Sequence, residues 1–120
     1  MTVDPFTDRL ARVRVRFATT LEGKIDDACA AIPRLSAPEP AALAILGETY
    51  RNMHGIVGVG PTVGFPASGS AALKVEDVLR APQQQQRGLN AKEIAALTNS
   101  LQTLREAATR ELQSFHSLRP

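Results

Sequence analysis

Apolar residues recur every three or four positions along four stretches of the chain, which is the spacing of one face of an α-helix. The first stretch runs from about residue 7 to residue 32, and Pro33 ends it because proline disrupts a helix interior. The apolar stripe of this stretch is Leu10, Val13, Phe17, Leu21, Ile25, Ala28 and Ile32. The pattern therefore predicts a long first helix that buries one face.

A second apolar stretch predicts a helix that begins after Pro33 and fades near Gly60 and Pro61. Ser36 and Glu39 have the spacing of a capping box, in which two side chains satisfy free N–H groups at a helix start. The stripe of this helix is Leu43, Leu46, Tyr50 and Met53.

Two further helices are expected in the second half of the chain. The third covers about residues 65–80, with Ala72, Leu73, Val75 and Leu79 available for the core. Residues 81–88 are expected to form a polar connector. Asn90 and Glu93 match a second capping box and open the fourth helix. The stripe of the fourth helix is Ile94, Leu97, Leu101, Leu104, Ala108 and Leu112. Residues 118–120 are expected to fray.

Four amphipathic helices joined by short loops predict an all-α fold, an antiparallel up-down four-helix bundle. A chain of 120 residues is long enough for one hydrophobic core. We therefore expect a single domain over residues 1–120, with its core between about residues 7 and 117.

Composition excludes several classes of protein. Fourteen basic and twelve acidic residues leave a net charge of +2, which is too little to predict a nucleic-acid-binding surface. The start of the chain lacks the features of a secretory signal, and no apolar run approaches the length of a membrane span. The single cysteine, Cys29, fits a reducing compartment, and no metal-ligand spacing occurs. We expect a soluble cytoplasmic protein with no metal site, no membrane contact and no nucleic-acid partner.

The candidate chemistry is concentrated at His54, one of two histidines in the chain. Gly55, Gly58 and Gly60 follow it closely, although each glycine in a helix costs about 1 kcal/mol relative to alanine. Residues i and i+4 share a helix face, so Gly58 leaves His54 without a neighbouring side chain. An imidazole is largely neutral and nucleophilic near pH 7, and one left open in this way is a candidate phosphoryl acceptor.

At these residues the chain resembles the histidine-containing phosphotransfer (HPt) family. The motif of that family has a glycine four residues after the histidine, then a second glycine followed by an aromatic residue or leucine. The matching segments are His54-Gly-Ile-Val-Gly58, Gly64-Phe65 and Ala71-Ala-Leu-Lys-Val-Glu76, and the pattern is closest to the phosphotransfer domain of chemotaxis kinases. The resemblance implies that His54 is the phosphoacceptor. It also implies that Glu76 accepts a hydrogen bond from the ring and fixes its tautomer.

The chain departs from the family pattern three residues after the histidine, where the family often has lysine and this chain has Val57. Another cation would then have to stabilise the phosphoryl group. Arg51, three residues before His54, and Lys74 are the candidates.

The remaining site candidates concern the docking of a partner. Gly58 would provide clearance for the partner, and Val57 and Phe65 could border an apolar surface, as could Tyr50 and Met53. Gly64 is a binding candidate by its place in the motif, although a turn that requires positive φ would explain this glycine equally well.

The resemblance implies a phosphorelay carrier in two-component signalling. Such a chain accepts a phosphoryl group from the aspartate of one receiver domain and passes it to another, so its partners are the receiver domains of hybrid kinases and response regulators. It needs no cofactor of its own, because the Mg²⁺ belongs to the receiver, and it acts as a monomer. No nucleotide-binding motif is present, so we expect no autonomous kinase activity.

Two alternatives belong to other classes of protein. A helical adaptor would keep the bundle but carry no phosphate, and the absence of the lysine at Val57 favours it. A dimerising phosphotransfer domain of a sensor kinase would place an acidic residue directly after the histidine, where this chain has Gly55.

Overall fold

The structure, a computed structural model, describes residues 5–36 and 41–117. These residues form four long helices and two 3-10 turns, with no β-strand among them. The elements are α1 (Pro5–Ala31), η1 (Ile32–Arg34), α2 (Ala42–Val59), η2 (Gly60–Val63), α3 (Pro66–Gln85) and α4 (Ala91–Ser117). The expected all-α class is confirmed.

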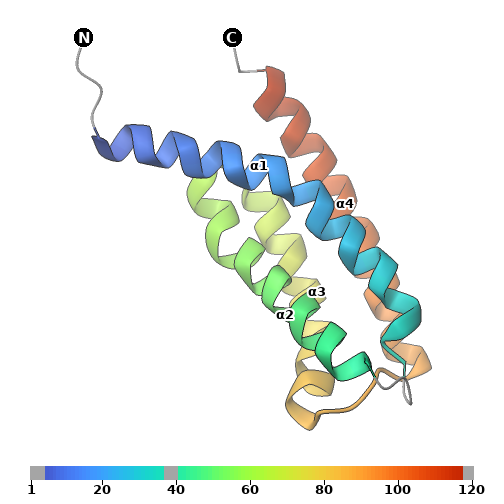
Figure 1. Cartoon of the computed structure of the whole chain (residues 1–120). Helices are drawn as coiled ribbons and strands as arrows, with labels where there is room; N and C mark the ends of the chain where they lie inside the picture. The colour runs from blue at the N-terminus through green and yellow to red at the C-terminus, as the bar shows by residue number, and fades with distance from the viewer. Residues whose placement is uncertain (1–4, 37–40, 118–120) are drawn as a thin grey trace.

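The helices pack against one another around one hydrophobic core (Figure 1). Helix α3 lies between α2 and α4, and α1 contacts both α2 and α4. The predicted stripes of α1 and α4 supply much of the core, and Leu21, Ile25, Leu97, Leu101 and Leu104 are each at most 1% exposed. Burial of these leucines and isoleucines contributes about 1.5–3 kcal/mol for each side chain.

The first turns of α1 extend past the other helices (Figure 1). Phe6 is 70% exposed and Val13 is 42% exposed, so the prediction that Val13 belongs to the core was wrong. Leu10 is partly buried against the core and the stripe is fully buried from Phe17 to Ala28, whereas Val13 lies beside Val59 of α2 without being covered by it. A periodic pattern identifies a helix face, but it does not show how closely a neighbouring helix approaches each residue on that face.

The turn between α2 and α3 brings two backbones unusually close together. The N–H of Phe65 donates to the carbonyl of Gly60 at 2.8 Å, and the N–H of Gly69 donates to the carbonyl of Phe65 at 3.0 Å. A Cβ atom at Gly69 would lie 2.8 Å from Cδ of Pro61, so only glycine fits there. Gly64 has φ of 92°, which confirms the turn that requires positive φ.

The start of α3 is capped by a side chain from α4. The carboxylate of Glu111 accepts hydrogen bonds from the backbone N–H groups of Ala67 at 3.0 Å and Ser68 at 2.7 Å. A negative charge at a helix N-terminus is favourable because the first N–H groups have no partner within the helix. Glu111 therefore ties the end of α4 to the start of α3.

Helix α3 continues five residues beyond the predicted end at Arg80. Pro82 lies inside its last turns and is buried, so burial of the ring offsets the hydrogen bond that proline cannot donate. The polar connector was therefore wrong for residues 81–85. Leu73 and Leu43, both predicted for the core, are each 43% exposed. Leu73 points away from the buried face of α3, and Leu43 lies in the first turn of α2.

The predicted capping box at the start of α4 is confirmed. The N–H of Glu93 donates to Oδ1 of Asn90 at 2.8 Å, and the N–H of Asn90 donates to Oε1 of Glu93 at 2.9 Å. Arg87 adds two hydrogen bonds to the Glu93 carboxylate, at 2.7 and 2.9 Å. Of the capping box expected from Ser36 to Glu39, only Ser36 is among the described residues. The fraying expected at residues 118–120 also lies outside them.

This cap predicts a stability difference that depends on pH. The hydrogen bonds from Arg87, and next those from the Asn90 backbone, hold the pKa of Glu93 below its ordinary value of 4.5 against the opposing effect of burial. Stability from the charged carboxylate is therefore present above pH 4.5 and is lost as pH falls through the lowered pKa. We expect Glu93→Gln to lower the free energy of unfolding at pH 7 and to match the parent at low pH. Urea unfolding of the parent and of Glu93→Gln, from pH 7 down to below the lowered pKa of Glu93, measures the difference in free energy of unfolding.

Replacement of Asn90, the other residue of the capping box, is the control for the loss of the cap without loss of the Glu93 charge. Asn90→Ala should lower the free energy of unfolding by about 1 kcal/mol at pH 7. A Glu93→Gln deficit that stays constant as pH falls would contradict the role assigned to the charge.

Candidate functional site

His54 lies on the outer side of α2 at mid-helix. Its neighbours Met53 and Ile56 are fully buried and fix the rotation of the helix, which leaves 71% of the His54 side chain exposed. The ring nitrogen Nδ1 lies 3.1 Å from Oε1 of Glu76 on α3. No described residue forms a hydrogen bond with the other ring nitrogen, Nε2.

Glu76 is the buried member of this pair, with only 6% of its side chain exposed. An ionised carboxylate can only accept hydrogen bonds, so in a neutral imidazole this contact requires the proton on Nδ1 and leaves the lone pair on Nε2. The contact brings together the two residues that the resemblance to the HPt family pairs. In that form of the ring, the nucleophilic nitrogen faces away from the carboxylate.

Two more side chains reach the same carboxylate oxygen. The hydroxyl of Tyr50 lies 3.3 Å from Oε1 of Glu76, and Nη2 of Arg80 lies 3.7 Å from it. Tyr50 stands one turn before His54 on α2, and Arg80 stands one turn after Glu76 on α3. Oε2 of Glu76 is buried and has no hydrogen-bond partner among the described residues.

Arg80 is held in place by its own partners. Nη1 of Arg80 lies 2.6 Å from Oδ1 of Asp77. The hydrogen bond with Asp77, and next the one with Tyr50, raise the pKa of Arg80, so its charge beside Glu76 is permanent. Oε1 of the Glu76 carboxylate is thus surrounded by three other side chains, which supply a guanidinium, a phenol and an imidazole.

Gly55 and Gly58 leave the surface next to His54 bare. A Cβ atom at either position would meet no heavy atom within 4 Å. The fold therefore imposes no steric need for glycine there, in contrast to Gly69. Gly23 on α1 is equally bare, but no candidate reactive residue lies one turn from it.

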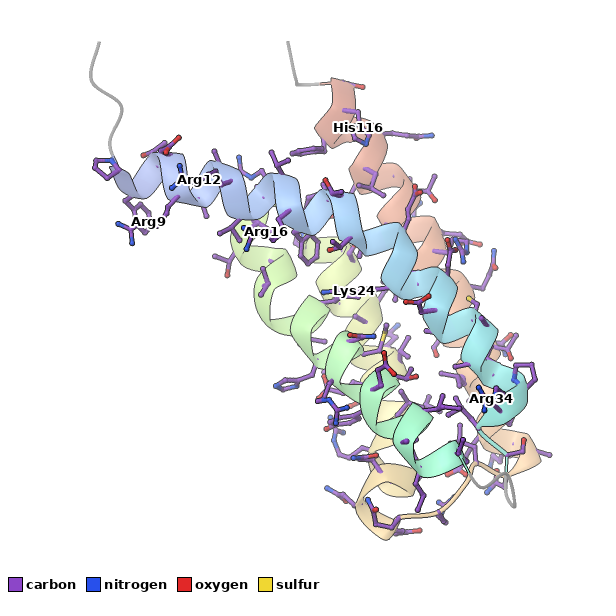
Figure 2. The ribbon with its side chains drawn as sticks, in the orientation of Figure 1. Arg9, Arg12, Arg16, Lys24, Arg34 and His116 are labelled. Carbon is purple, nitrogen blue, oxygen red and sulfur yellow. The ribbon has the colours of Figure 1, made fainter. Side chains whose placement is uncertain are left out.

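A shallow groove between α1 and α2 continues from the bare surface. Its volume is about 320 Å³. It is lined by Val13, Arg16, Phe17, Thr20, Lys24, Gly55 and Val59. The valines at its edge are 42% and 39% exposed, and Arg16 and Lys24 give it a positive charge (Figure 2). The groove has an apolar floor and a cationic rim. It lies on the side of α2 that faces α1, beginning at Gly55, the residue after His54.

The two cations expected near the histidine do not reach it. A Cβ atom at Gly47 would lie 3.3 Å from Nη1 of Arg51, so this guanidinium lies toward the start of α2. Lys74 precedes Glu76 by two residues, which is about 200° around a helix, so it lies on the opposite side of α3. Neither has an ion pair with Glu76 among the described residues.

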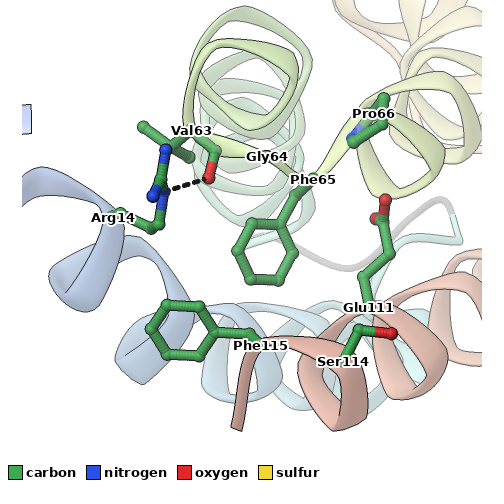
Figure 3. A pocket seen from close by; sticks show the side chains of 8 residues that line it. All are labelled: Arg14, Val63, Gly64, Phe65, Pro66, Glu111, Ser114 and Phe115. Atoms are coloured by element: carbon green, nitrogen blue, oxygen red, sulfur yellow. Dashed lines mark hydrogen bonds between the residues drawn. The ribbon is translucent and has the colours of Figure 1, made fainter. Parts of the chain in front are cut away.

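Gly64 and Phe65 also lie away from His54. Phe65 is 1% exposed and packs between the rings of Phe17 and Phe115, with centroids 5.1 and 5.9 Å away. The prediction that Phe65 borders the docking surface was therefore wrong, because the ring belongs to the core. Both residues line a different cavity, of about 460 Å³, where Nε of Arg14 donates to the carbonyl of Val63 at 2.9 Å (Figure 3). Met53 is likewise fully buried, whereas Val57 and Tyr50 are partly exposed.

Sequence reasoning missed Arg80 and the hydroxyl contact of Tyr50. The signal for Arg80 was its position four residues after Glu76, which places both on one face of α3. The contact of Tyr50 depends on how α2 and α3 are set against each other, and no spacing within one helix shows it.

Within the described ranges, no three His, Cys, Asp or Glu side chains gather as a metal site would require. The helices of residues 5–36 and 41–117 include none that is both long and apolar enough to cross a membrane. Comparisons with protein-family models, curated proteins and solved structures gave no match to this chain. The site must therefore be interpreted from its own geometry.

The bare glycines predict an unusual mutational response. Gly55→Ala and Gly58→Ala should each raise the free energy of unfolding by about 0.5–1 kcal/mol, because alanine lowers the entropy of the unfolded chain and meets open space. Chemical denaturation measures the change.

Two further glycines serve as controls. Gly23→Ala should stabilise by a similar amount, whereas Gly69→Ala should destabilise by about 1–3 kcal/mol through overlap with Pro61. Destabilisation by Gly58→Ala would mean that the fold itself requires this glycine.

Proposed function

We propose that the chain is a phosphotransfer carrier of the HPt kind, an antiparallel up-down four-helix bundle that holds a phosphoryl group on His54. The observation that carries the proposal is an imidazole with 71% exposure whose Nδ1 lies 3.1 Å from a buried carboxylate. A histidine kept for packing would be covered, and a surface histidine without a role would not need a buried carboxylate behind it.

The geometry supports a simple transfer step. The lone pair of Nε2 forms a bond to phosphorus while the bond between phosphorus and the carboxyl oxygen of a partner aspartate breaks, which returns that aspartate to its ionised form. The imidazole keeps the proton on Nδ1 and becomes positively charged. Glu76 stabilises this charge from 3.1 Å, and Nε2 requires no base because it carries no proton.

The surroundings of His54 support docking of a folded partner. The bare positions Gly55 and Gly58 allow a partner to approach the backbone of α2 closely, as transfer between two proteins requires. The groove beside them has an apolar floor, and Arg16 and Lys24 give its rim a positive charge. A receiver domain that holds Mg²⁺ with carboxylates presents acidic groups that complement this rim.

The proposal assigns most of the transfer machinery to the partner. Phosphoryl transfer depends mainly on positioning and on charge stabilisation, so one protein can supply the metal and the other only a nucleophile. The carrier would work in the cytoplasm as a monomer between receiver domains of hybrid kinases and response regulators. Arg80 and Arg16 are better placed than Arg51 or Lys74 to meet the partner near His54.

Replacement of the nucleophile tests the proposal directly. After incubation with phosphorylated receiver domains, the parent should acquire an acid-labile, base-stable phosphate, and His54→Ala should acquire none. Because the side chain is exposed, His54→Ala should keep its helicity, and loss of one hydrogen bond to the buried Glu76 should lower the free energy of unfolding by about 1–2 kcal/mol.

His116→Ala is the matched control, since it removes the other histidine, on the exposed surface of α4. It should accept phosphate like the parent. A parent that takes up no phosphate from any receiver would favour the helical adaptor, and equal labelling of His54→Ala would place the phosphate elsewhere.

A large side chain at Gly58 should hinder docking of the partner at the surface next to His54 and leave the fold intact. Gly58→Gln adds a long side chain where a Cβ meets no atom of the chain, so the fold should tolerate it. A displacement of the partner by about 1 Å or more should reduce the transfer rate by about a hundredfold. Single-turnover transfer from a phosphorylated receiver measures the rate.

Ala95→Gln is the control, because Ala95 is an exposed position on α4, away from α2 and from the groove. It should transfer at close to the parent rate. A Gly58→Gln protein that transfers like the parent would rule out the use of this surface for docking.

A further inference from the structure

The hydroxyl of Tyr50 shares its acceptor with the candidate nucleophile. Oε1 of Glu76 lies 3.3 Å from the Tyr50 hydroxyl and 3.1 Å from Nδ1 of His54, while Oε2 has no hydrogen-bond partner among the described residues. With both donors on one oxygen, the plane of the carboxylate is held in one orientation, because a partial turn about its last bond would lengthen both contacts. The hydroxyl thus helps to keep a carboxylate oxygen against Nδ1 of the imidazole.

Tyr50 also limits the orientation of the imidazole itself. The two rings are nearly parallel, with an interplanar angle of 8° and centroids 6.4 Å apart. They lie one turn apart on α2, so the phenol ring flanks the side of the imidazole that faces the start of the helix. A flip of the imidazole about its Cβ–Cγ bond would put Cδ2 in the place of Nδ1 and so remove the hydrogen bond to Glu76.

We propose that Tyr50 is a positioning residue for phosphoryl acceptance, which holds Oε1 of Glu76 so that His54 keeps its proton on Nδ1 and presents Nε2. This inference rests on the proposed function and adds to it the residue that selects the reacting nitrogen. Arg80 has a different part, because its Nη2 lies 3.7 Å from Oε1, beyond hydrogen-bond distance. Arg80 contributes charge, and Tyr50 contributes orientation.

The tautomer of His54 is the property to measure, and no partner protein is required. Two-bond ¹H–¹⁵N correlation spectra of ¹⁵N-labelled protein at about pH 8.5, where free imidazoles are neutral, distinguish the two tautomers. In the parent, His54 should carry its proton predominantly on Nδ1. A parent with the proton predominantly on Nε2 would overturn the inference whatever the variants show.

Tyr50→Phe removes the hydroxyl and keeps the ring. The Nδ1–H share of His54 should fall to about half, because one of the two hydrogen bonds that orient the carboxylate is lost. Arg80→Gln removes the charge and one partner of the Tyr50 hydroxyl but keeps the phenol and Glu76, so the tautomer of His54 should change less than in Tyr50→Phe. An unchanged tautomer in Tyr50→Phe, or an equal change in both variants, would overturn the inference.

His116 provides an internal control in every spectrum. It lies on α4, where its ring contacts Phe115, and its signals should not move in either variant. Circular dichroism should confirm unchanged helicity in Tyr50→Phe.

A small chemical donor connects the tautomer to reactivity. Phosphoramidate should phosphorylate His54 of Tyr50→Phe about twofold more slowly than His54 of the parent, in step with the smaller share of free Nε2. The rate for His116 should stay the same, and an unchanged rate for His54 despite an altered tautomer would remove Tyr50 from the reaction. If the tautomer responds as expected but no receiver transfers phosphate, only the proposed function fails.

Discussion

The hydrogen bond between Glu76 and His54 joins α3 to α2 at the candidate site, and the rest of the arrangement depends on it. Burial of a carboxylate is costly unless hydrogen bonds and opposite charge compensate for the lost hydration. Here Oε1 lies 3.1 Å from Nδ1 of His54 and 3.3 Å from the hydroxyl of Tyr50, and the guanidinium of Arg80 adds opposite charge at 3.7 Å. The same contacts that stabilise the buried charge also set the orientation of the exposed ring. Stability and reactivity are thereby linked at one oxygen atom.

The scaffold positions this contact through ordinary helix geometry. Tyr50 and His54 are one turn apart on α2, and Glu76 and Arg80 are one turn apart on α3, so the four side chains form two facing pairs. The buried faces of the two helices fix their rotation, and the Glu111 cap fixes where α3 begins. The site therefore requires no loop to order on binding, and the reactive ring lies on a rigid element.

Much of this arrangement could be predicted because it is local in sequence. The four helices follow from apolar spacing, and the cap formed by Asn90 and Glu93 follows from a three-residue pattern. The pairing of His54 with Glu76 came from resemblance to a family, and no spacing within one helix would have shown it. Features that depend on tertiary packing were missed or wrong: the reach of Glu111 across more than forty residues, the burial of Phe65, and the exposure of Val13 at the groove between α1 and α2.

The tight turn between α2 and α3 has a consequence for the length of the chain. Gly69 lies against Pro61 with no room for a side chain, so the register of the two helices is set within about ten residues. One residue inserted there would rotate α3 by about 100° and carry Glu76 away from the imidazole. The connection after Gln85 is held in other ways, by the buried Leu89 and its hydrogen bond to the carbonyl of Leu35, and α4 contributes no side chain to the carboxylate. A change in length before Asn90 would therefore disturb the packing of α4, whereas the same change in the α2–α3 corner would separate Glu76 from His54 directly.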